Sequence, residues 1–329
     1  MRLWLRFVPL VLPMFPAGVA AAAEGAGPFV QALWLIQRYG HSDVIVPEND
    51  RKLKGALSKA LGKSGLLTEA SANSFLPPSV FSKLAGPDGV LDPSEARNHL
   101  EVDMPESRKR LFPRVAEHAD LLTTSFDLID EPHREAAAKL VDWIVANYRS
   151  GQPLPITVIC TGNSRRSMLG AILGNIAAAY YGMPEIRFHS GGTAPSAFNR
   201  RTIATLKEIG VEVEPTGREA ARGEPQTANP IYSVRWGIGL EATEFSKTYL
   251  DPVNPQHDFA ALLVCGEADA GCPVVKGASV RISMPYLDPK IYDDSPFEAR
   301  KYAERRDDIG RLMLCVMMQV RNRLQQAER

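Results

Sequence analysis

The sequence predicts an α/β fold: a parallel four-stranded sheet flanked by helices, with a helical extension on its amino-terminal side. Two observations favour this fold. Short apolar segments rich in β-branched residues alternate with helix-like segments from residue 156 onward. The chain of 329 residues, 45% of them hydrophobic, is also long enough for one large domain or two modest ones. We expect ligands of such a sheet to gather at the carboxyl ends of its strands.

Residues 1–23 have the pattern of a secretory signal peptide. Arg2 and Arg6 accompany an apolar run, and alanines at 20–23 offer a cleavage site. The run is too short to cross a bilayer, so we expect no membrane span. We therefore expect export to a periplasm or the cell exterior, with removal of residues 1–23. The alternative is a cytoplasmic protein with an apolar amino-terminal arm.

Residues 24–150 are predicted to form a helical region to which no chemistry can be assigned. Segments 28–39 and 51–61 are typical of short helices. A longer helix should start at 130–132, because Asp caps a helix and Pro suits its first turn. Apolar residues then recur at helical spacing, at Ala137, Leu140, Val141, Ile144 and Tyr148.

Residues 151–329 are predicted to form the α/β domain. Residues 215–257, rich in Gly and Pro with four aromatic residues, are interpreted as an insertion, in which Tyr232 and Trp236 either flank the substrate or pack the loop. The last helix presents one apolar face, formed by Ile309, Leu312, Met313, Val316, Met317 and Val320. The expected strands are 156–159, 186–189, 211–213, 259–264 and 280–283, and the expected helices are 167–181 and 198–209.

The strongest functional signal is the stretch from Cys160 to Ser167, where an apolar strand ends at a thiol and a short loop leads to Arg166 at a helix start. The N–H groups of so tight a loop, and the positive end of the helix, bind tetrahedral oxyanions. Arg166 can grip two oxygens, and within that ring Cys160 would be a thiolate near neutral pH. The alternative is an inert buried cysteine beside a surface arginine. The loop residues expected to bind the substrate are Thr161, Gly162, Asn163, Ser164 and Arg165, with Asn163 in a left-handed conformation.

Three further cysteines follow, too few for a disulfide scaffold in so long a chain. Cys265 ends a predicted strand, so it would face the same crevice as Cys160 if both strands belong to one parallel sheet. Cys272 stands seven residues later, close enough to bridge to Cys265 if the turn between them folds back. Cys315 lies in an apolar run and is interpreted as a core residue.

With these motifs, the chain resembles the low-molecular-weight protein tyrosine phosphatase superfamily, and most closely its thioredoxin-coupled arsenate reductase branch. The sequence CTGNSRRS at 160–167 is similar to the CxGNxxRS phosphate loop of that family. The segments HSGGT at 189–193, CGEADAGCP at 265–273 and LDP at 287–289 are similar to further family motifs. The resemblance covers about residues 155–325. It departs at Arg165, where many members carry another cysteine.

The resemblance implies roles for six catalytic residues. Cys160 would attack arsenic or phosphorus, while Arg166 and the loop N–H groups stabilise charge on the equatorial oxygens. Ser167 would donate a hydrogen bond to the Cys160 sulfur, and Asp288 would protonate the leaving oxygen. In a reductase, Cys265 would attack the Cys160 adduct and Cys272 would then form a disulfide with Cys265. An external thioredoxin-like dithiol reductant would reopen that disulfide.

Arsenate reduction by this three-thiol relay is the first functional expectation. The alternative is a phosphatase acting on phosphotyrosine or a small phosphomonoester through a cysteinyl-phosphate, which needs only Cys160, Arg166 and Asp288. A second alternative is a non-catalytic oxyanion-binding or redox-sensing protein with a permanent Cys265–Cys272 disulfide. We expect no metal site, because the six histidines lack metal-ligand spacing, and no bound cofactor. A net charge of zero gives no reason to expect nucleic acid as a partner.

Overall fold

The structure, a computed structural model, describes residues 66–72, 81–82, 85, 87–91, 105–123, 125–223, 226–271 and 274–327. The chain forms two compact units, residues 1–104 with 123–125 and residues 105–122 with 126–329. The predicted signal peptide at 1–23 and the predicted helices at 28–39 and 51–61 lie outside the described residues.

In the first unit, the described residues include a short antiparallel strand pair between β1 (Leu67–Thr68) and β2 (Val90–Leu91). The helix α4 (Glu69–Ala72) follows β1 directly. Leu67 pairs with Leu91, and both are buried. The prediction of a purely helical region before residue 150 is therefore incomplete, because these apolar positions pair as strands.

The second unit contains the predicted parallel four-stranded sheet, with strand order β4-β3-β8-β9. The central strand β3 is buried on both faces, as a parallel sheet covered on both sides requires. Val158 points to one face, where it meets Gly170 of the following helix so closely that a Cβ there would lie 2.7 Å from its Cγ1. Ile159 points to the other face and packs with Phe259 and Leu263. The strands are β3 (Leu154–Cys160), β4 (Ile186–Gly192), β8 (Phe259–Leu263) and β9 (Ala278–Ser283).

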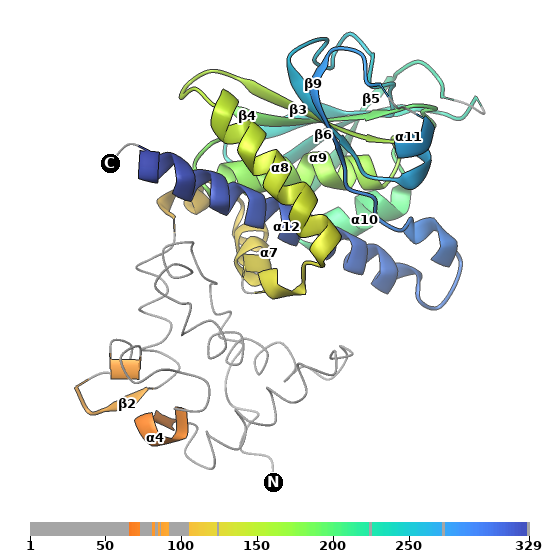
Figure 1. Cartoon of the computed structure of the whole chain (residues 1–329). Coiled ribbons are helices and arrows are strands. Elements are labelled where there is room, and N and C mark those ends of the chain that lie inside the picture. The colour runs from red at the N-terminus through yellow and green to blue at the C-terminus, as the bar shows by residue number, and fades with distance from the viewer. Residues whose placement is uncertain are drawn as a thin grey trace. The chain divides into compact units, whose positions relative to one another are not determined.

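Helices that precede, connect and follow the strands in the sequence pack against the sheet or against one another (Figure 1). The helix α9 (Arg166–Tyr180), predicted at 167–181, packs on β3 and β4, and α8 (Glu131–Asn147) packs on β9. Both contact α12 (Glu298–Ala327), whose predicted apolar face is buried. The remaining helices of this unit are η2 (Glu106–Arg110), α7 (Pro113–Thr123), η3 (Phe126–Leu128), α10 (Arg200–Glu208), α11 (Gly266–Gly271) and η4 (Pro289–Tyr292).

Capping side chains start two of these helices, and the sequence predicts the first of these caps, Asp130. Asp130 accepts a hydrogen bond from the His133 N–H at 3.0 Å and caps α8. Asn199 caps α10, and Gly210 follows the end of that helix with φ of 91°. The compact unit begins at Pro105, so α7 and α8 belong to it and the predicted boundary at 150/151 falls inside it.

The predicted insertion at 215–257 is largely a second sheet. It contains the antiparallel strands β5 (Glu212–Glu219), β6 (Pro230–Gly237) and β7 (Leu240–Glu244). The strand expected at 211–213 is the start of β5, so it belongs to this second sheet and not to the parallel sheet. The segment after β7 returns to the core, where Thr248 forms an isolated parallel bridge with Gly192 at the end of β4. This segment therefore lies beside the carboxyl end of the main sheet.

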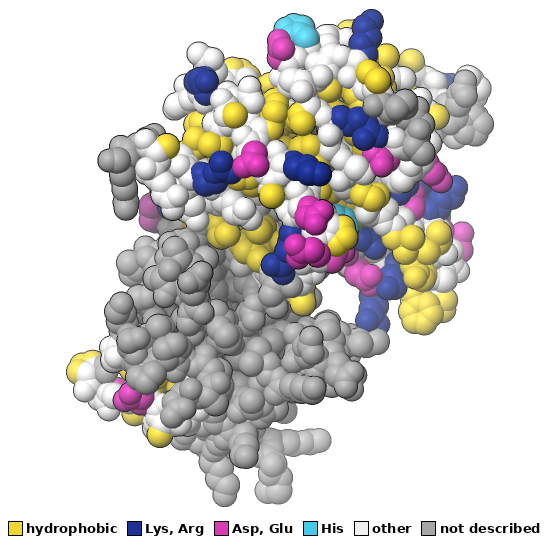
Figure 2. Space-filling model, viewed as in Figure 1, with side chains coloured by type: hydrophobic (Ala, Val, Ile, Leu, Met, Phe, Trp, Pro, Cys, Tyr) yellow, Lys and Arg dark blue, Asp and Glu magenta, His cyan; other side chains and the backbone are white. Residues whose placement is uncertain are grey.

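The surface of the second unit carries charges of both signs. On the face seen in Figure 2, Lys and Arg side chains alternate with Asp and Glu over the α/β unit. Within the described part of the chain, no helix is both long enough and apolar enough to cross a membrane.

Candidate functional site

The loop from Cys160 to Arg166, here called the Cys160 loop, joins the end of β3 to the start of α9. Its carbonyl groups are directed outward and tied to neighbouring segments. The Thr193 N–H donates to the Cys160 oxygen at 3.1 Å, and the Ser196 N–H donates to the Gly162 oxygen at 3.0 Å. Among the described residues, no group accepts a hydrogen bond from the N–H groups of residues 161–165. These N–H groups are therefore free to face an oxyanion, as in an anion-binding nest.

The end of β4 must approach this loop closely, which explains a glycine in the motif at 189–193. A Cβ at Gly192 would lie 2.6 Å from the Thr161 oxygen and 2.9 Å from the Asn163 backbone nitrogen. Real Cβ atoms do not approach other atoms so closely, so a larger residue would displace the Cys160 loop.

The thiol of Cys160 is buried and lies 3.1 Å from the Ser167 hydroxyl oxygen. Asn163 has the left-handed conformation expected from the sequence, with φ of 41°. Its Nδ2 donates a hydrogen bond to Ser167 Oγ at 2.9 Å. Because Ser167 Oγ accepts this bond, its own proton is free to point at the sulfur. In this arrangement Ser167 can donate a hydrogen bond to the Cys160 sulfur.

Arg166 and Asp288 form an ion pair beside the Cys160 loop, although 122 residues separate them in the chain. Nη2 of Arg166 lies 2.7 Å from Asp288 Oδ2, and Nη1 donates to the Tyr286 carbonyl oxygen at 2.9 Å. The Nε of Arg166 is buried and has no hydrogen-bond partner among the described residues. Arg166 therefore keeps the Nε–H donor available to a ligand, while its Nη1 and Nη2 groups hold the segment around Asp288.

Arg165, expected to bind substrate, has its guanidinium on the side of α12. Its Nε donates to the Tyr302 hydroxyl at 2.8 Å. The same guanidinium lies 3.6 Å from Asp293 Oδ2. The other predicted binding residues, Thr161, Gly162 and Ser164, lie in the loop with Asn163. Ser164 donates through its hydroxyl to the Ala197 oxygen at 2.6 Å, so it holds the loop from outside.

Cys265 lies next to the Cys160 loop, as predicted from its strand-end position. It is buried, and its sulfur is 3.5 Å from the Thr161 hydroxyl oxygen. The Ala268 N–H donates to the same sulfur at 3.3 Å, at the start of α11. The Thr161 hydroxyl also donates to Glu267 at 3.0 Å. Cys272 lies outside the described residues, whereas Cys315 is half-buried on α12 and accepts a hydrogen bond from Gln319 at 3.2 Å.

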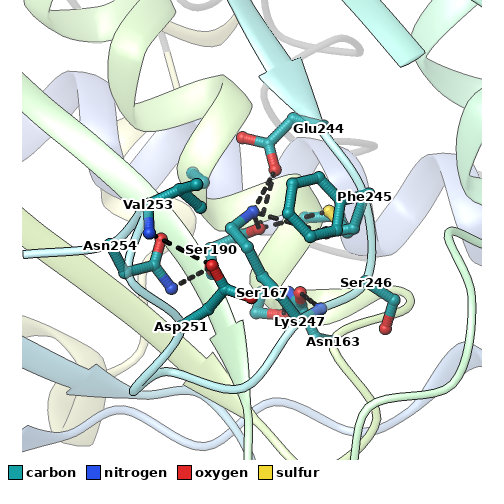
Figure 3. A network of polar contacts seen from close by, with 12 residues as sticks. Asn163, Ser167, Ser190, Glu244, Phe245, Ser246, Lys247, Asp251, Val253 and Asn254 are labelled. Carbon is teal, nitrogen blue, oxygen red and sulfur yellow. Dashed lines mark hydrogen bonds and ion pairs between the residues drawn. The ribbon is translucent and has the colours of Figure 1, made fainter. Parts of the chain in front are cut away.

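A buried ion pair behind the Cys160 loop was not anticipated from the sequence (Figure 3). Lys247 Nζ lies 3.1 Å from Glu244 Oε2, and each side chain is only 4% exposed. Ser190 of β4 donates to the same Glu244 oxygen at 2.8 Å, and Lys247 Nζ donates to Ser190 at 3.3 Å. The backbone N–H of Lys247 donates to Asn163 Oδ1 at 2.8 Å. This network therefore connects the second sheet to the residue that orients Ser167.

The aromatic residues of the second sheet mainly pack the protein. Trp236 is 1% exposed, which favours the packing interpretation over contact with a substrate. Tyr232 packs edge-to-face on Phe198, with ring centroids 5.6 Å apart.

Burial lowers the pKa of His189 on β4 to about 4, so this histidine is neutral at physiological pH. Among the described residues, no group of three or more His, Cys, Asp or Glu side chains could hold a metal ion.

The chain was compared with models of known families and with curated proteins. No family model matches the chain. No curated protein matches it at a significant level. The chemistry of the chain is therefore inferred from the Cys160 loop and the side chains around it.

Proposed function

We propose that this protein is a cysteine-dependent phosphomonoesterase related to the low-molecular-weight protein tyrosine phosphatases. The observation that carries the proposal is the meeting of three groups from two segments that lie 122 residues apart in the chain. Cys160 lies 3.1 Å from Ser167 Oγ at the two ends of the Cys160 loop region, and Arg166 at the end of that loop pairs with Asp288 at 2.7 Å. A nucleophile, a cation for the oxyanion and a carboxyl group are the parts that phosphoryl transfer through a thiol needs.

In the first step, the Cys160 sulfur attacks phosphorus while the bond from phosphorus to the ester oxygen breaks. Asp288 gives its proton to the departing oxygen, so the leaving group departs as a neutral alcohol or phenol. In the second step, water attacks the cysteinyl-phosphate and Asp288 takes a proton from that water. The thiolate of Cys160 leaves and inorganic phosphate is formed. Arg166 and the loop N–H groups stabilise the equatorial oxygens in both steps.

The ion pair between Arg166 and Asp288 suits this cycle. An arriving oxyanion competes with Asp288 for Arg166, because both present oxygen acceptors to the same guanidinium. Once Arg166 turns to the ligand, Asp288 loses a strong charge partner. Loss of that partner favours the protonated carboxyl, which is the form that a general acid requires.

Arsenate reduction is the second candidate, because Cys265 lies beside the Cys160 loop with its sulfur 3.5 Å from the Thr161 hydroxyl. The Cys160 sulfur would first displace an oxygen from arsenate. Cys265 would then attack the Cys160 sulfur, and a Cys160–Cys265 disulfide would form as the sulfur–arsenic bond breaks. The two electrons of that bond would stay on arsenic, which leaves as arsenite. Cys272 would transfer the disulfide to the Cys265–Cys272 pair, which an external thioredoxin-like dithiol would reduce. If the protein is exported, as residues 1–23 suggest, that reductant must act outside the cytoplasm.

The two activities are separated by variants of single residues in the full chain. Aryl phosphate hydrolysis should vanish in Cys160→Ser and survive in Cys265→Ser and Cys272→Ala. Arsenite release with a thioredoxin system should vanish in all three. If the wild type neither hydrolyses aryl phosphates nor reduces arsenate, yet binds phosphate, it is an oxyanion-binding protein and the enzyme proposal is wrong.

A further inference from the structure

We propose that Arg165 is a positioning residue that holds the segment 285–294, here called the Asp288 loop, in reach of the Cys160 loop. This inference rests on the proposed function, because Asp288 is its general acid. Arg165 and Arg166 are adjacent, but their guanidinium groups donate hydrogen bonds to different residues. Arg166 contacts Tyr286 and Asp288. Arg165 contacts the far end of the same loop at Asp293 and the Tyr302 hydroxyl.

Tyr302 provides a fixed support for this contact. It comes from α12 and is 1% exposed. Its hydroxyl accepts from Arg165 Nε at 2.8 Å and donates to Asp293 Oδ1 at 2.8 Å. Burial, together with the Asp293 carboxylate, raises the pKa of Tyr302 to about 12, so the hydroxyl keeps its proton for Asp293. Both hydrogen bonds are directional, which sets the position of the guanidinium and of the Asp293 carboxylate.

A second arginine holds the end of the Asp288 loop from α10. Arg201 lies 2.6 Å from Asp294 Oδ1 and 2.6 Å from Glu298 Oε2. It also lies 3.5 Å from Asp293, which therefore sits between Arg165 and Arg201. Arg201 keeps the loop on the body of the protein, while Arg165 connects the loop to the start of α9. Among the described residues, Arg165 is the residue of the Cys160 loop that forms an ion pair with Asp293.

The need for Arg165 arises when substrate binds. Arg166 is the cation nearest to Asp288. When the substrate binds, its oxyanion replaces Asp288 as the partner of Arg166. Arg165 Nε, 3.9 Å from Asp288 Oδ1, is then the remaining cationic group within 4.0 Å of Asp288 among the described residues. Through Asp293 and Tyr302, Arg165 holds the Asp288 loop near the Cys160 loop without contacting the oxyanion. Loss of Arg165 should therefore affect proton donation more than substrate binding.

Proton donation matters most when the leaving group is a poor one, so the test compares two substrates. Phenyl phosphate needs a general acid more than 4-nitrophenyl phosphate, whose phenolate is a far better leaving group. In Arg165→Met, kcat/KM should fall about tenfold further for phenyl phosphate than for 4-nitrophenyl phosphate. Tyr302→Phe should cause a smaller change in the same direction, and it preserves the volume of the side chain if Arg165→Met folds poorly.

Two controls make the result specific. In an Asp288→Asn background, Arg165→Met should cause no further difference between the substrates, because the two residues act on one step. Arg306→Met removes another buried arginine, whose guanidinium contacts Thr205 and Glu208 and not the Asp288 loop. It should not change the ratio of the two rates. An equal rise in KM for both substrates in Arg165→Met would mean that Arg165 binds the oxyanion directly, and would overturn the inference.

Failure of the inference is distinguishable from failure of the proposed function. If Asp288→Asn hydrolyses both substrates as well as the wild type, the proposed function is wrong, whatever Arg165 does. Hydrogen exchange then still tests the positioning role. The amides of Tyr286 and Asp293, bonded to Val264 and Lys290, should exchange faster in Arg165→Met than in Arg306→Met. Equal exchange in the two variants would contradict a role of Arg165 in holding the loop.

Discussion

Asn163 Nδ2 lies 2.9 Å from the hydroxyl oxygen of Ser167, which in turn lies 3.1 Å from the Cys160 sulfur. The amide nitrogen of Asn163 can only donate, so the Ser167 oxygen accepts and its proton is left for the sulfur. The orientation of one hydroxyl proton thus depends on a residue in the left-handed conformation. This relationship explains why the loop needs both Asn163 and Ser167 to prepare Cys160 for attack.

Substitution of Ser167 should slow the chemistry of Cys160 without unfolding the protein. In Ser167→Ala, the sulfur loses a hydrogen bond that favours its charged form, which is worth about 1.5–3 kcal/mol. We expect the alkylation of Cys160 by iodoacetamide at neutral pH to slow about tenfold or more. Peptide mass spectrometry should follow each cysteine separately. Ser233→Ala on β6 is the control, and an unchanged rate in Ser167→Ala would contradict the assigned hydrogen bond.

Asn163 contributes both a backbone conformation and a side chain, and two variants separate them. Asn163→Ala and Asn163→Gly both lose the bonds to Ser167 and to the Lys247 N–H, so both should lose most activity. Glycine tolerates the φ of 41° and alanine does not. Urea unfolding should therefore find Asn163→Gly more stable than Asn163→Ala by about 1 kcal/mol. Equal stability of the two variants would mean that the loop has changed its conformation.

Removing one partner of the buried pair of Lys247 and Glu244 should destabilise the protein strongly, whereas replacing both with apolar residues should destabilise it much less. Each side chain is only 4% exposed, so Lys247→Met leaves a buried carboxylate without its cation. We expect a loss of about 3–5 kcal/mol in the free energy of unfolding, and recovery of much of it in Lys247→Met/Glu244→Leu. The exposed pair of Lys207 and Glu214 is the matched control and should cost less than about 1 kcal/mol. A small effect of Lys247→Met would show that water reaches the pair.

Asp120 should make stability depend on pH in a direction unusual for a carboxyl group. Burial raises the pKa of Asp120 from 3.8 to about 6, against the opposing effect of Arg108. The folded state then holds a proton that the unfolded state releases, so this contribution to stability is full below pH 4 and is lost as pH rises to about 6. The contribution lost over this pH range is at most about 3 kcal/mol of the free energy of unfolding.

The comparison variant is Asp120→Asn, which cannot titrate. Its stability relative to wild type, from urea unfolding, should improve between pH 4 and pH 6.5. Asp142→Asn, at a side chain 68% exposed, should show no such trend. A difference between wild type and Asp120→Asn that does not vary with pH would show that Asp120 keeps its ordinary acidity in the folded protein.

The sequence is sufficient to predict features whose causes are local. The order of strand, thiol, Gly-Asn loop and helix predicts the ends of β3 and α9, because each boundary has a residue that favours it. The left-handed Asn163 follows for the same reason. The position of Cys265 beside the Cys160 loop also follows from strand ends that share one edge of a parallel sheet.

Features that depend on distant partners could not be predicted. Glu244 and Lys247 are charged, and charged residues are almost always exposed unless they are paired. Their burial needs Ser190, which is 54 residues from Glu244 in the chain. The direction of the Arg165 side chain depends on Tyr302, 137 residues away. The sequence predicts only the start of β5, as a strand at 211–213, because the exposed sequence EVEPTGRE lacks the apolar alternation of a half-buried strand.

The most direct test is to trap the covalent intermediate. Asp288→Ala removes the group that activates water in the second step, so a good aryl phosphate substrate should leave phosphate on the enzyme. Rapid acid quenching and peptide mass spectrometry should find one phosphoryl group on Cys160, released with the kinetics of phosphate formation. Turnover with the phosphoryl group on another residue, or turnover that persists in Cys160→Ser, would contradict the account.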